Sequence, residues 1–168
     1  RGLVGSEMCI RDRPIFSLQT AMGLISISML YSFAFAVNQL MDLDTDSRNE
    51  TKSSLSLASG KMSKQTAKIT TLLLVVGIIV TGWFVNIPYF LLSLGFLAVN
   101  ILYSCPPFRF KAKRVLDLFT IALGLGVFPI LLPWVLAQPI GLVPLELILG
   151  VMLFNVAAHC FQMLGDIE

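Results

Sequence analysis

Charged residues are scarce in this chain. Only 13% of its 168 residues are Asp, Glu, Lys or Arg, whereas a soluble domain carries roughly 25%. The net charge of +2 is too small to favour a nucleic-acid partner. The three cysteines, Cys9, Cys105 and Cys160, lack the spacing of a metal site, and their odd number argues against a disulfide framework. The composition therefore excludes an ordinary soluble domain, a nucleic-acid-binding protein and a disulfide scaffold.

The chain is rich in long apolar runs. Apolar residues make up 56% of the chain, and the mean hydropathy is +0.83. Each apolar run approaches or exceeds the ~20 residues that a membrane-spanning helix needs. We therefore predict an all-α, polytopic transmembrane helix bundle that is integral to the membrane. The five expected spans are 15–41, 67–87, 88–105, 115–137 and 143–164.

Positive charge gathers in two of the connections between these runs. Five Lys or Arg residues fall within 42–68 and four within 106–114, and the other connections are nearly uncharged. Because successive spans alternate in direction, both basic segments lie on one side of the membrane. Basic loops are enriched on the cytoplasmic side. We therefore expect the site-bearing loops to be cytoplasmic, with Asp166 and Glu168 on the same side.

An acidic motif ends the first span. Asn38, Asp42 and Asp46 are spaced four residues apart, so on a helix they drift only ~40° per step and share one face. A simple explanation is a polar helix end that meets water. However, stacked oxygen ligands beside a spanning helix are costly unless something binds there, and Mg²⁺ prefers such ligands together with substrate phosphates. The motif predicts a Mg²⁺ site.

A basic segment follows the third span. The paired prolines in 103–111 (Tyr-Ser-Cys-Pro-Pro-Phe-Arg-Phe-Lys) should end that helix. An extended chain beyond them would send Arg109 and Lys111 to one side and Phe108 and Phe110 to the other. An ordinary loop that contacts lipid headgroups is one interpretation. Beside an acidic metal site, two fixed cations also suit a diphosphate leaving group.

Three ionisable residues in the last two spans allow more than one interpretation. His159 lies in an apolar run and is either a hydrogen-bonded packing residue or part of a prenyl or acceptor pocket. Asp117 could form an ion pair with Arg114, or its negative charge could interact favourably with the helix N-terminus. A role for Asp117 in the metal or substrate site ranks second to these structural interpretations. Asp166 is either a polar helix end or part of a second acidic cluster.

These motifs together resemble the signatures of the UbiA family of membrane prenyltransferases. The first is Asn-x-x-x-Asp-x-x-x-Asp, followed by the turn at 57–60. The second is the Tyr-Ser-x-Pro-Pro-x-Arg-Phe-Lys stretch of 103–111, and the third is Gly-Asp-Ile-Glu at 165–168, which is similar to the opening of a second Asp-x-x-x-Asp signature. The resemblance covers essentially all of 15–168.

The resemblance implies a nine-helix bundle with a central cavity open to the bilayer. The five spans here would be family helices two to six, so that 14–168 is a partial UbiA prenyltransferase domain. Residues 1–13 are expected to be a non-native leader, because they show no continuity with the run that follows. The second aspartate of the last signature is absent, and we expect these 168 residues alone to be inactive.

The activity implied by the resemblance is a Mg²⁺-dependent transfer of a prenyl group. The donor would be a polyprenyl diphosphate, which ionises to an allylic cation within the membrane lipid, and the acceptor would be lipophilic. The expected metal ligands are Asn38, Asp42, Asp46 and Asp166. The expected catalytic residues are Asp42, Asp46, Asp166 and Tyr103. Arg109 and Lys111 would bind the diphosphate, with Lys52 as a weaker candidate.

The acceptor and two other functions remain open at this stage. The residues around His159 look closest to members that act on isoprenoid acceptors, such as lycopene elongases, while aromatic quinone precursors and glyceryl ethers remain possible acceptors. A cation-coupled transporter fragment is the first alternative function, although transporters place such sites near the bilayer midplane on broken helices. Another membrane transferase with a diphosphate donor is the second.

Overall fold

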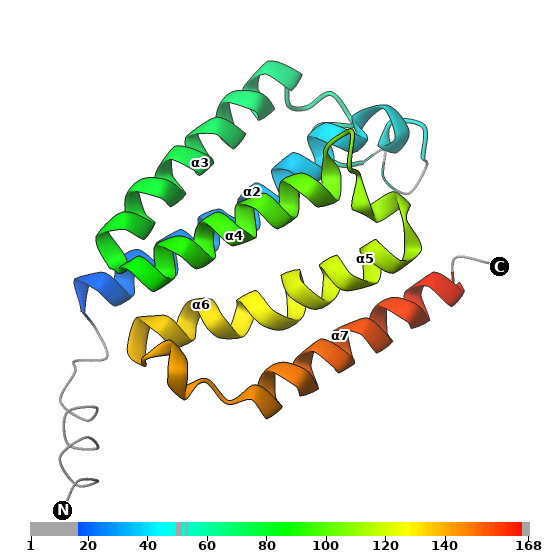
Figure 1. Cartoon of the computed structure of the whole chain (residues 1–168). Helices are drawn as coiled ribbons and strands as arrows, with labels where there is room; N and C mark the ends of the chain where they lie inside the picture. The colour runs from blue at the N-terminus through cyan, green and yellow to red at the C-terminus, as the bar shows by residue number, and fades with distance from the viewer. Residues whose placement is uncertain (1–16, 50–51, 53, 166–168) are drawn as a thin grey trace, which may run out of the picture.

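The computed structural model describes residues 17–49, 52 and 54–165, and this part of the chain contains helices and turns but no strand. Its principal helices are α2 (Leu18–Asp46), α3 (Lys64–Val85), α4 (Ile87–Ser104), α5 (Arg114–Ile121), α6 (Phe128–Ala137) and α7 (Leu145–Gly165) (Figure 1). The expected leader 1–13, together with Asp166 and Glu168, lies outside the described residues.

The described ranges contain five helical segments that are long and apolar enough to cross a membrane. Four of them are α2, α3, α4 and α7. The remaining one is the continuous helical segment Arg114–Ala137, which joins α5 and α6 through a π-helical turn, η2 (Ala122–Val127). The prediction of an all-α, polytopic bundle is therefore confirmed, with span ends that differ from the expected ones by a few residues.

Side-chain caps explain where three of these helices begin. Ser17 Oγ accepts a hydrogen bond from the Thr20 amide at 3.1 Å, and Ser63 Oγ accepts one from the Thr66 amide at 3.0 Å. At the turn between α3 and α4, Asn86 Oδ1 accepts from the Tyr89 amide at 2.8 Å. Each cap satisfies an amide that would otherwise have no partner in the first turn. Cap residues therefore fix the helix starts locally.

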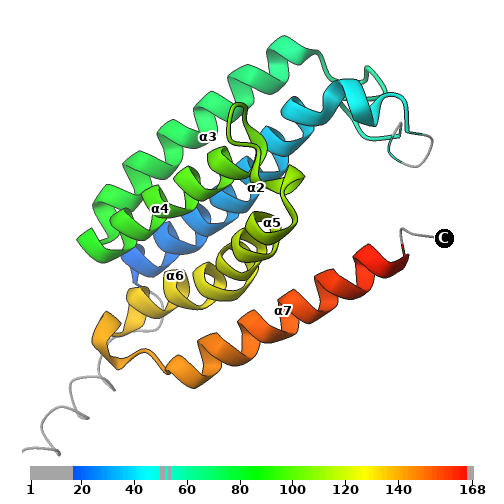
Figure 2. The same ribbon diagram turned by 45° about the vertical axis from the view of Figure 1, so that its right-hand side comes forward.

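The core lies between α2, α3, α4 and α6, which pack side by side (Figure 2). Tyr89 is fully buried there, and its hydroxyl donates to the Gly23 carbonyl of α2 at 3.0 Å. Asn86 Nδ2 donates to the Val135 carbonyl of α6 at 2.9 Å, which ties the α3–α4 turn to the next span. The core side chains are Leu30, Phe33, Val37, Ile78, Val85, Tyr89, Phe96, Leu97, Phe128, Leu132 and Val135.

The π-helical turn η2 has an identifiable cause in the sequence. Pro129 follows it and has no amide hydrogen, so the carbonyl of Leu125, four residues earlier, loses its usual helical donor. Asn155 of α7 supplies a replacement, because its Nδ2 donates to that carbonyl at 3.2 Å. A neighbouring helix often satisfies a carbonyl freed in this way within a membrane.

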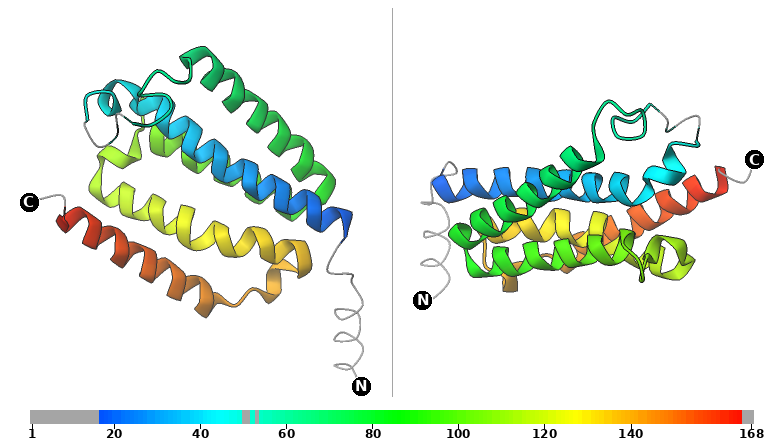
Figure 3. Two further views of the ribbon diagram at one scale, coloured as in Figure 1. Left: turned by 180° about the vertical axis from the view of Figure 1, so that it is seen from behind. Right: turned by 90° about the horizontal axis from the view of Figure 1, so that it is seen from above.

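The two basic loops meet at one end of the bundle. The described residues of the first loop (47–49, 52 and 54–63) and residues 105–113 lie there, together with the C-terminal end of α7. The short connections around Asn86 and 138–144 lie at the opposite end (Figures 1 and 3). The second connection includes the short helix η3 (Ile140–Leu142). The bundle thus has one polar, charged end and one nearly uncharged end.

Candidate active site

The acidic motif occupies the last turns of α2. The helix continues through Asp46, so Asn38, Asp42 and Asp46 share the face that their spacing predicts. Asp46 is buried, with an exposed fraction of 6%. Asp44, which lies between Asp42 and Asp46 in the sequence, is exposed. The motif therefore turns its polar groups toward the protein and is not simply a helix end in water.

The segment after α4 brings two cations to this face. Arg109 Nη2 donates to Asp42 Oδ1 at 3.1 Å. Lys111 Nζ donates to Asp42 Oδ2 and, at 3.0 Å, to Asn38 Oδ1. Two cations thus share one carboxylate, so the cluster carries an excess of positive charge. Such a cluster attracts a further anion, and guanidinium and ammonium groups are good phosphate ligands.

The predicted extended conformation of this segment is wrong. Pro106 and Pro107 do prevent α4 from continuing past Ser104, but Arg109 then adopts the left-handed region with φ of 38°. A short 3-10 helix, η1 (Phe110–Ala112), follows at once. A left-handed residue other than glycine costs about 1–2 kcal/mol, and the contacts of Arg109 and Lys111 with Asp42 offset this cost. The chain turns here so that both cations reach the same acid.

Two aromatic residues of this segment contact each other. The rings of Phe108 and Phe110 contact each other edge to face, with centroids 6.3 Å apart. Cys105, at the start of the segment, packs against the core. Burial raises the pKa of its thiol above the ordinary value, and the positive charge of Lys111 partly offsets that rise. The thiol is therefore protonated at neutral pH and acts as an apolar packing group.

Asp46 has a partner of its own. Lys52 Nζ lies 3.6 Å from Asp46 Oδ1, and the lysine side chain is more than half exposed. The structure thus places Lys52 beside the acidic motif but not on Asp42. Its expected contact with a diphosphate stays a prediction. An exposed lysine that pairs with Asp46, one helical turn beyond Asp42, can reorient at little cost.

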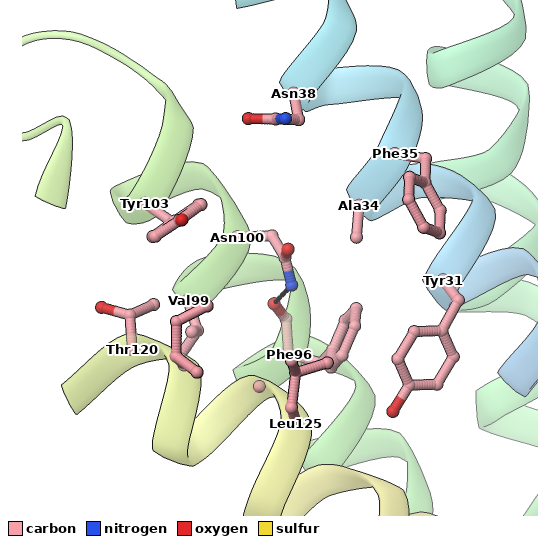
Figure 4. A pocket seen from close by; sticks show the side chains of 12 residues that line it. Tyr31, Ala34, Phe35, Asn38, Phe96, Val99, Asn100, Tyr103, Thr120 and Leu125 are labelled. Carbon is pink, nitrogen blue, oxygen red and sulfur yellow. Dashed lines mark hydrogen bonds between the residues drawn. The ribbon is translucent and has the colours of Figure 1, made fainter. Parts of the chain in front are cut away.

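A cavity of about 190 Å³ opens beside Asn38. Its polar end carries Asn38 and Tyr103, and its other end is formed largely by apolar and aromatic side chains, with Tyr31, Phe96 and Leu125 at the lower edge of Figure 4. A polar end next to a cationic cluster and an apolar far end suit an amphiphile with an anionic head. The lining residues are Tyr31, Ala34, Phe35, Asn38, Phe96, Val99, Asn100, Tyr103, Thr120, Ile121, Gly124 and Leu125.

Tyr103 connects the cavity with a second buried carboxylate. It lines the cavity, and its phenol is close enough to Asp117 and Asp42 to interact electrostatically with both. Tyr103 thus lies at the polar end of the cavity, within electrostatic range of Asp42. Its expected position beside a diphosphate and its catalytic role stay predictions.

Asp117 pairs with a residue that the sequence did not suggest as its partner. Its Oδ2 lies 2.8 Å from His159 Nε2, which joins α5 to α7. Of the two structural interpretations of Asp117, pairing with Arg114 is not met, whereas a position near a helix N-terminus is, since Asp117 lies in the first turn of α5. His159 is the hydrogen-bonded residue that one of its own two interpretations described. Asp117 is 6% exposed, and a buried carboxylate in a span needs such a partner. The sequence contained one signal for this pair, because Asp117 and His159 are ionisable residues in two successive apolar runs.

We expect His159→Leu to destabilise the protein. The change leaves the buried Asp117 carboxylate without its partner, which costs about 1–3 kcal/mol. The double variant Asp117→Leu/His159→Leu should recover most of the loss, because an apolar pair needs no hydrogen bonds. Melting temperatures in detergent measure both effects. A double variant that is less stable than His159→Leu would contradict this account of the pair.

The metal site that the sequence predicts lies only partly within the described residues. Asp166, the expected ligand from the second acidic signature, lies outside them. Within 17–49, 52 and 54–165, no group of three His, Cys, Asp or Glu side chains could hold a metal ion. Mg²⁺ in phosphate-binding sites, however, typically takes one or two carboxylates and completes its shell with substrate oxygens and water. The oxygens of Asn38 and Asp42, with Asp46 one turn further on, fit that pattern.

Comparisons with known proteins agree on one family. The profile of the UbiA prenyltransferase family matches residues 2–168. A UbiA homologue from Archaeoglobus fulgidus, solved with GPP and Mg²⁺, superposes with a TM-score of 0.72 at 26% identity, over 85% of this chain and 50% of that protein. A second structure, of a UbiA homologue from Archaeoglobus fulgidus solved with DMAPP and Mg²⁺, superposes with a TM-score of 0.68 at 26% identity. This match covers 83% of this chain and 50% of that protein.

A curated relative agrees with this assignment. A lycopene elongase/hydratase from Haloarcula japonica is 25% identical over 138 residues, which are 81% of this chain and 45% of the relative. The chain thus spans about half the length of each of these proteins. The fold, the order of its signatures and the profile match all agree, and the chain belongs to the UbiA prenyltransferase family.

Proposed function

We propose that the full-length protein transfers a prenyl group from a polyprenyl diphosphate to a lipophilic acceptor inside the membrane, and that it uses Mg²⁺. One observation carries the proposal. Asn38 and Asp42 share Lys111, and Asp42 also holds Arg109, at the polar end of an apolar cavity. The cluster provides acidic ligands for a metal and cations for a diphosphate within a few ångströms of each other.

Oxygen-bearing side chains of the two signature motifs would hold the metal. We assign this role to Asn38, Asp42 and Asp46, and to Asp166 from the second signature. The bound ion would neutralise charge that develops on the diphosphate leaving group. The similar Archaeoglobus fulgidus protein, solved with GPP and Mg²⁺, supports this assignment. The two carboxylates and one amide of α2 match the oxygen ligands that Mg²⁺ prefers.

The pairing in the structure suggests how the charged groups of the site keep partners without substrate. Arg109 and Lys111 contact Asp42. With a metal held at Asp42, the two cations would be free to bind diphosphate oxygens instead. Every charged group then has an opposite charge beside it both before and after binding, which avoids the penalty of a buried, unpaired ion. Lys52 would change partner from Asp46 in the same way.

The cavity would hold the prenyl chain of the donor. The allylic C–O bond breaks and its electron pair passes to the diphosphate oxygen, which Arg109, Lys111 and the Tyr103 hydroxyl stabilise. Apolar walls exclude water from the allylic cation, and aromatic rings such as Phe96 present faces that attract a cation. The acceptor's π electrons then form the new C–C bond, and a proton leaves the product.

The acceptor that we favour is an isoprenoid. Support comes from the residues around His159 and from the similarity to a lycopene elongase/hydratase. We also propose that the basic loops face the cytoplasm, because a charged diphosphate is made there and basic loops are enriched on that side. Aromatic and glyceryl ether acceptors are the alternatives that the following experiment distinguishes.

The test uses full-length protein with Mg²⁺, labelled geranylgeranyl diphosphate and a panel of isoprenoid, aromatic and glyceryl ether acceptors. We expect a labelled isoprenoid product that disappears when EDTA removes the metal. Transfer only to an aromatic or glyceryl ether acceptor would support the proposed prenyl transfer but show that the proposed isoprenoid acceptor is wrong. Failure to transfer to any acceptor, by protein that is folded and membrane-inserted, would contradict the proposal.

A further inference from the structure

Gly124 stands in the wall of the cavity, and no contact among the described residues requires a glycine there. It belongs to the π-helical turn η2 and lines the cavity. A Cβ built on it meets no atom of the described residues within 4 Å. Gly126, two residues further on, is different, because a Cβ there would come within 2.8 Å of the Met152 backbone. Gly126 is needed for close packing of α7, and Gly124 is not.

The backbone at Gly124 does not require glycine either. Among the described residues, Gly60 is the glycine with positive φ, so Gly124 has a conformation that any residue adopts. Glycine inside a helix is destabilising relative to alanine. Among the described residues, neither the backbone conformation nor a close contact explains why this helical position is a glycine, which lowers helix stability. The remaining explanation in the structure is the space itself, which a side chain at Gly124 would fill.

That space lies away from the diphosphate end. On α2 the cavity wall runs from Asn38 to Tyr31, seven residues or roughly 10 Å along the helix. On the facing segment the wall runs from Thr120 to Leu125. Figure 4 shows Tyr31 and Leu125 at the end opposite Asn38, and Gly124 directly precedes Leu125. A side chain at Gly124 would therefore enter the distal, apolar part of the cavity.

The size of the cavity makes such a side chain decisive. Its volume is about 190 Å³, and an apolar cavity of about 150 Å³ takes one benzene ring. By that scale a four-carbon side chain would occupy roughly half of the room. A prenyl chain that extends past its first five-carbon unit would then meet this side chain in the distal part of the cavity.

We propose that Gly124 is a specificity-determining residue that sets how far the donor's prenyl chain extends beyond the diphosphate end. The inference rests on the proposed function, since it needs a prenyl diphosphate in this cavity. The missing side chain leaves the distal half of the cavity free. Gly124 thus lets the protein bind donors longer than a single five-carbon unit.

The experiment compares two donors in full-length protein with Mg²⁺. Dissociation constants for geranyl diphosphate, with two five-carbon units, and for dimethylallyl diphosphate, with one, are measured by calorimetry. We expect Gly124→Leu to raise the ratio of the first constant to the second by at least about tenfold, which corresponds to ~1.4 kcal/mol. Gly124→Ala should raise it two- to threefold. Gly150→Leu is the matched control, because Gly150 is exposed on α7 and also has no atom within 4 Å of a Cβ; its ratio should match that of the wild type.

Several outcomes would overturn the inference. An unchanged ratio in a Gly124→Leu variant that melts like the wild type would show that the distal space does not hold the prenyl chain. Equal weakening of both donors would show a general effect on the site. If Gly124→Leu does not fold, an unchanged ratio in Gly124→Ala decides against the inference. Wild-type protein that binds neither donor would instead overturn the proposed function, and this inference with it.

Discussion

Asp42→Ala is expected to abolish Mg²⁺-dependent turnover while leaving membrane insertion intact. Asp42 is the residue on which both cations converge, and it shares Lys111 with Asn38 at the polar end of the cavity. Its loss removes a metal ligand and leaves Arg109 and Lys111 without their common partner. We expect a rate loss of at least about 10²–10³-fold, the scale seen when one preorganised electrostatic group is removed. Initial rates with labelled donor at saturating Mg²⁺ measure the effect.

Asp44→Ala is the matched control for this change. Asp44 lies two residues away on the same helix, but it is exposed on another face. The control removes the same charge from the same end of α2, so it should keep nearly wild-type rates. Turnover that survives in Asp42→Ala, or falls equally in Asp44→Ala, would show that the metal assignment is wrong.

Lys111→Ala is expected to weaken donor binding more than it slows chemistry. Lys111 Nζ donates to both Asn38 and Asp42, and its side chain is only 15% exposed. Hydrogen bonds to charged groups contribute about 1.5–3 kcal/mol, so loss of the contact to a diphosphate should raise the donor KM by roughly 10–150-fold. Steady-state kinetics with varied donor concentration separate the change in KM from the change in kcat.

Lys113→Ala separates substrate binding from membrane topology. Lys113 lies in the same loop but is exposed, and both variants remove one positive charge from the same basic segment. If Lys111 acted only as a topology signal, the two variants would behave alike and their kinetics would match those of the wild type. We expect the rise in KM in Lys111→Ala alone.

Hydropathy predicts the fold of this chain well because the bilayer restricts the possible structures. A spanning segment must satisfy its backbone groups internally, which selects helices, and bilayer thickness sets their length. Local signals then fix helix starts, as Ser63 does through its cap on Thr66. The four-residue spacing of Asn38, Asp42 and Asp46 predicts their common face for the same reason. These features depend on short stretches of sequence.

Contacts between distant segments could not be predicted in this way. The pair formed by Asp117 and His159 joins residues 42 positions apart, and no periodicity indicates which ionisable residues will meet. The left-handed Arg109 contacts Asp42, 67 positions away, and without such a contact a residue other than glycine rarely adopts this region. The π-helical turn before Pro129 similarly needs Asn155 of another helix. Tertiary packing decides each of these features.

The most direct test of the central claim is the metal dependence of donor binding. Geranyl diphosphate is titrated calorimetrically into full-length protein in lipid nanodiscs, once with Mg²⁺ and once with EDTA. The arrangement of Asn38 and Asp42 with Arg109 and Lys111 predicts saturable binding with Mg²⁺ that weakens at least about tenfold when the metal is removed. Binding of equal strength in EDTA, or no binding in either condition, would contradict a metal–diphosphate site at this end of the bundle.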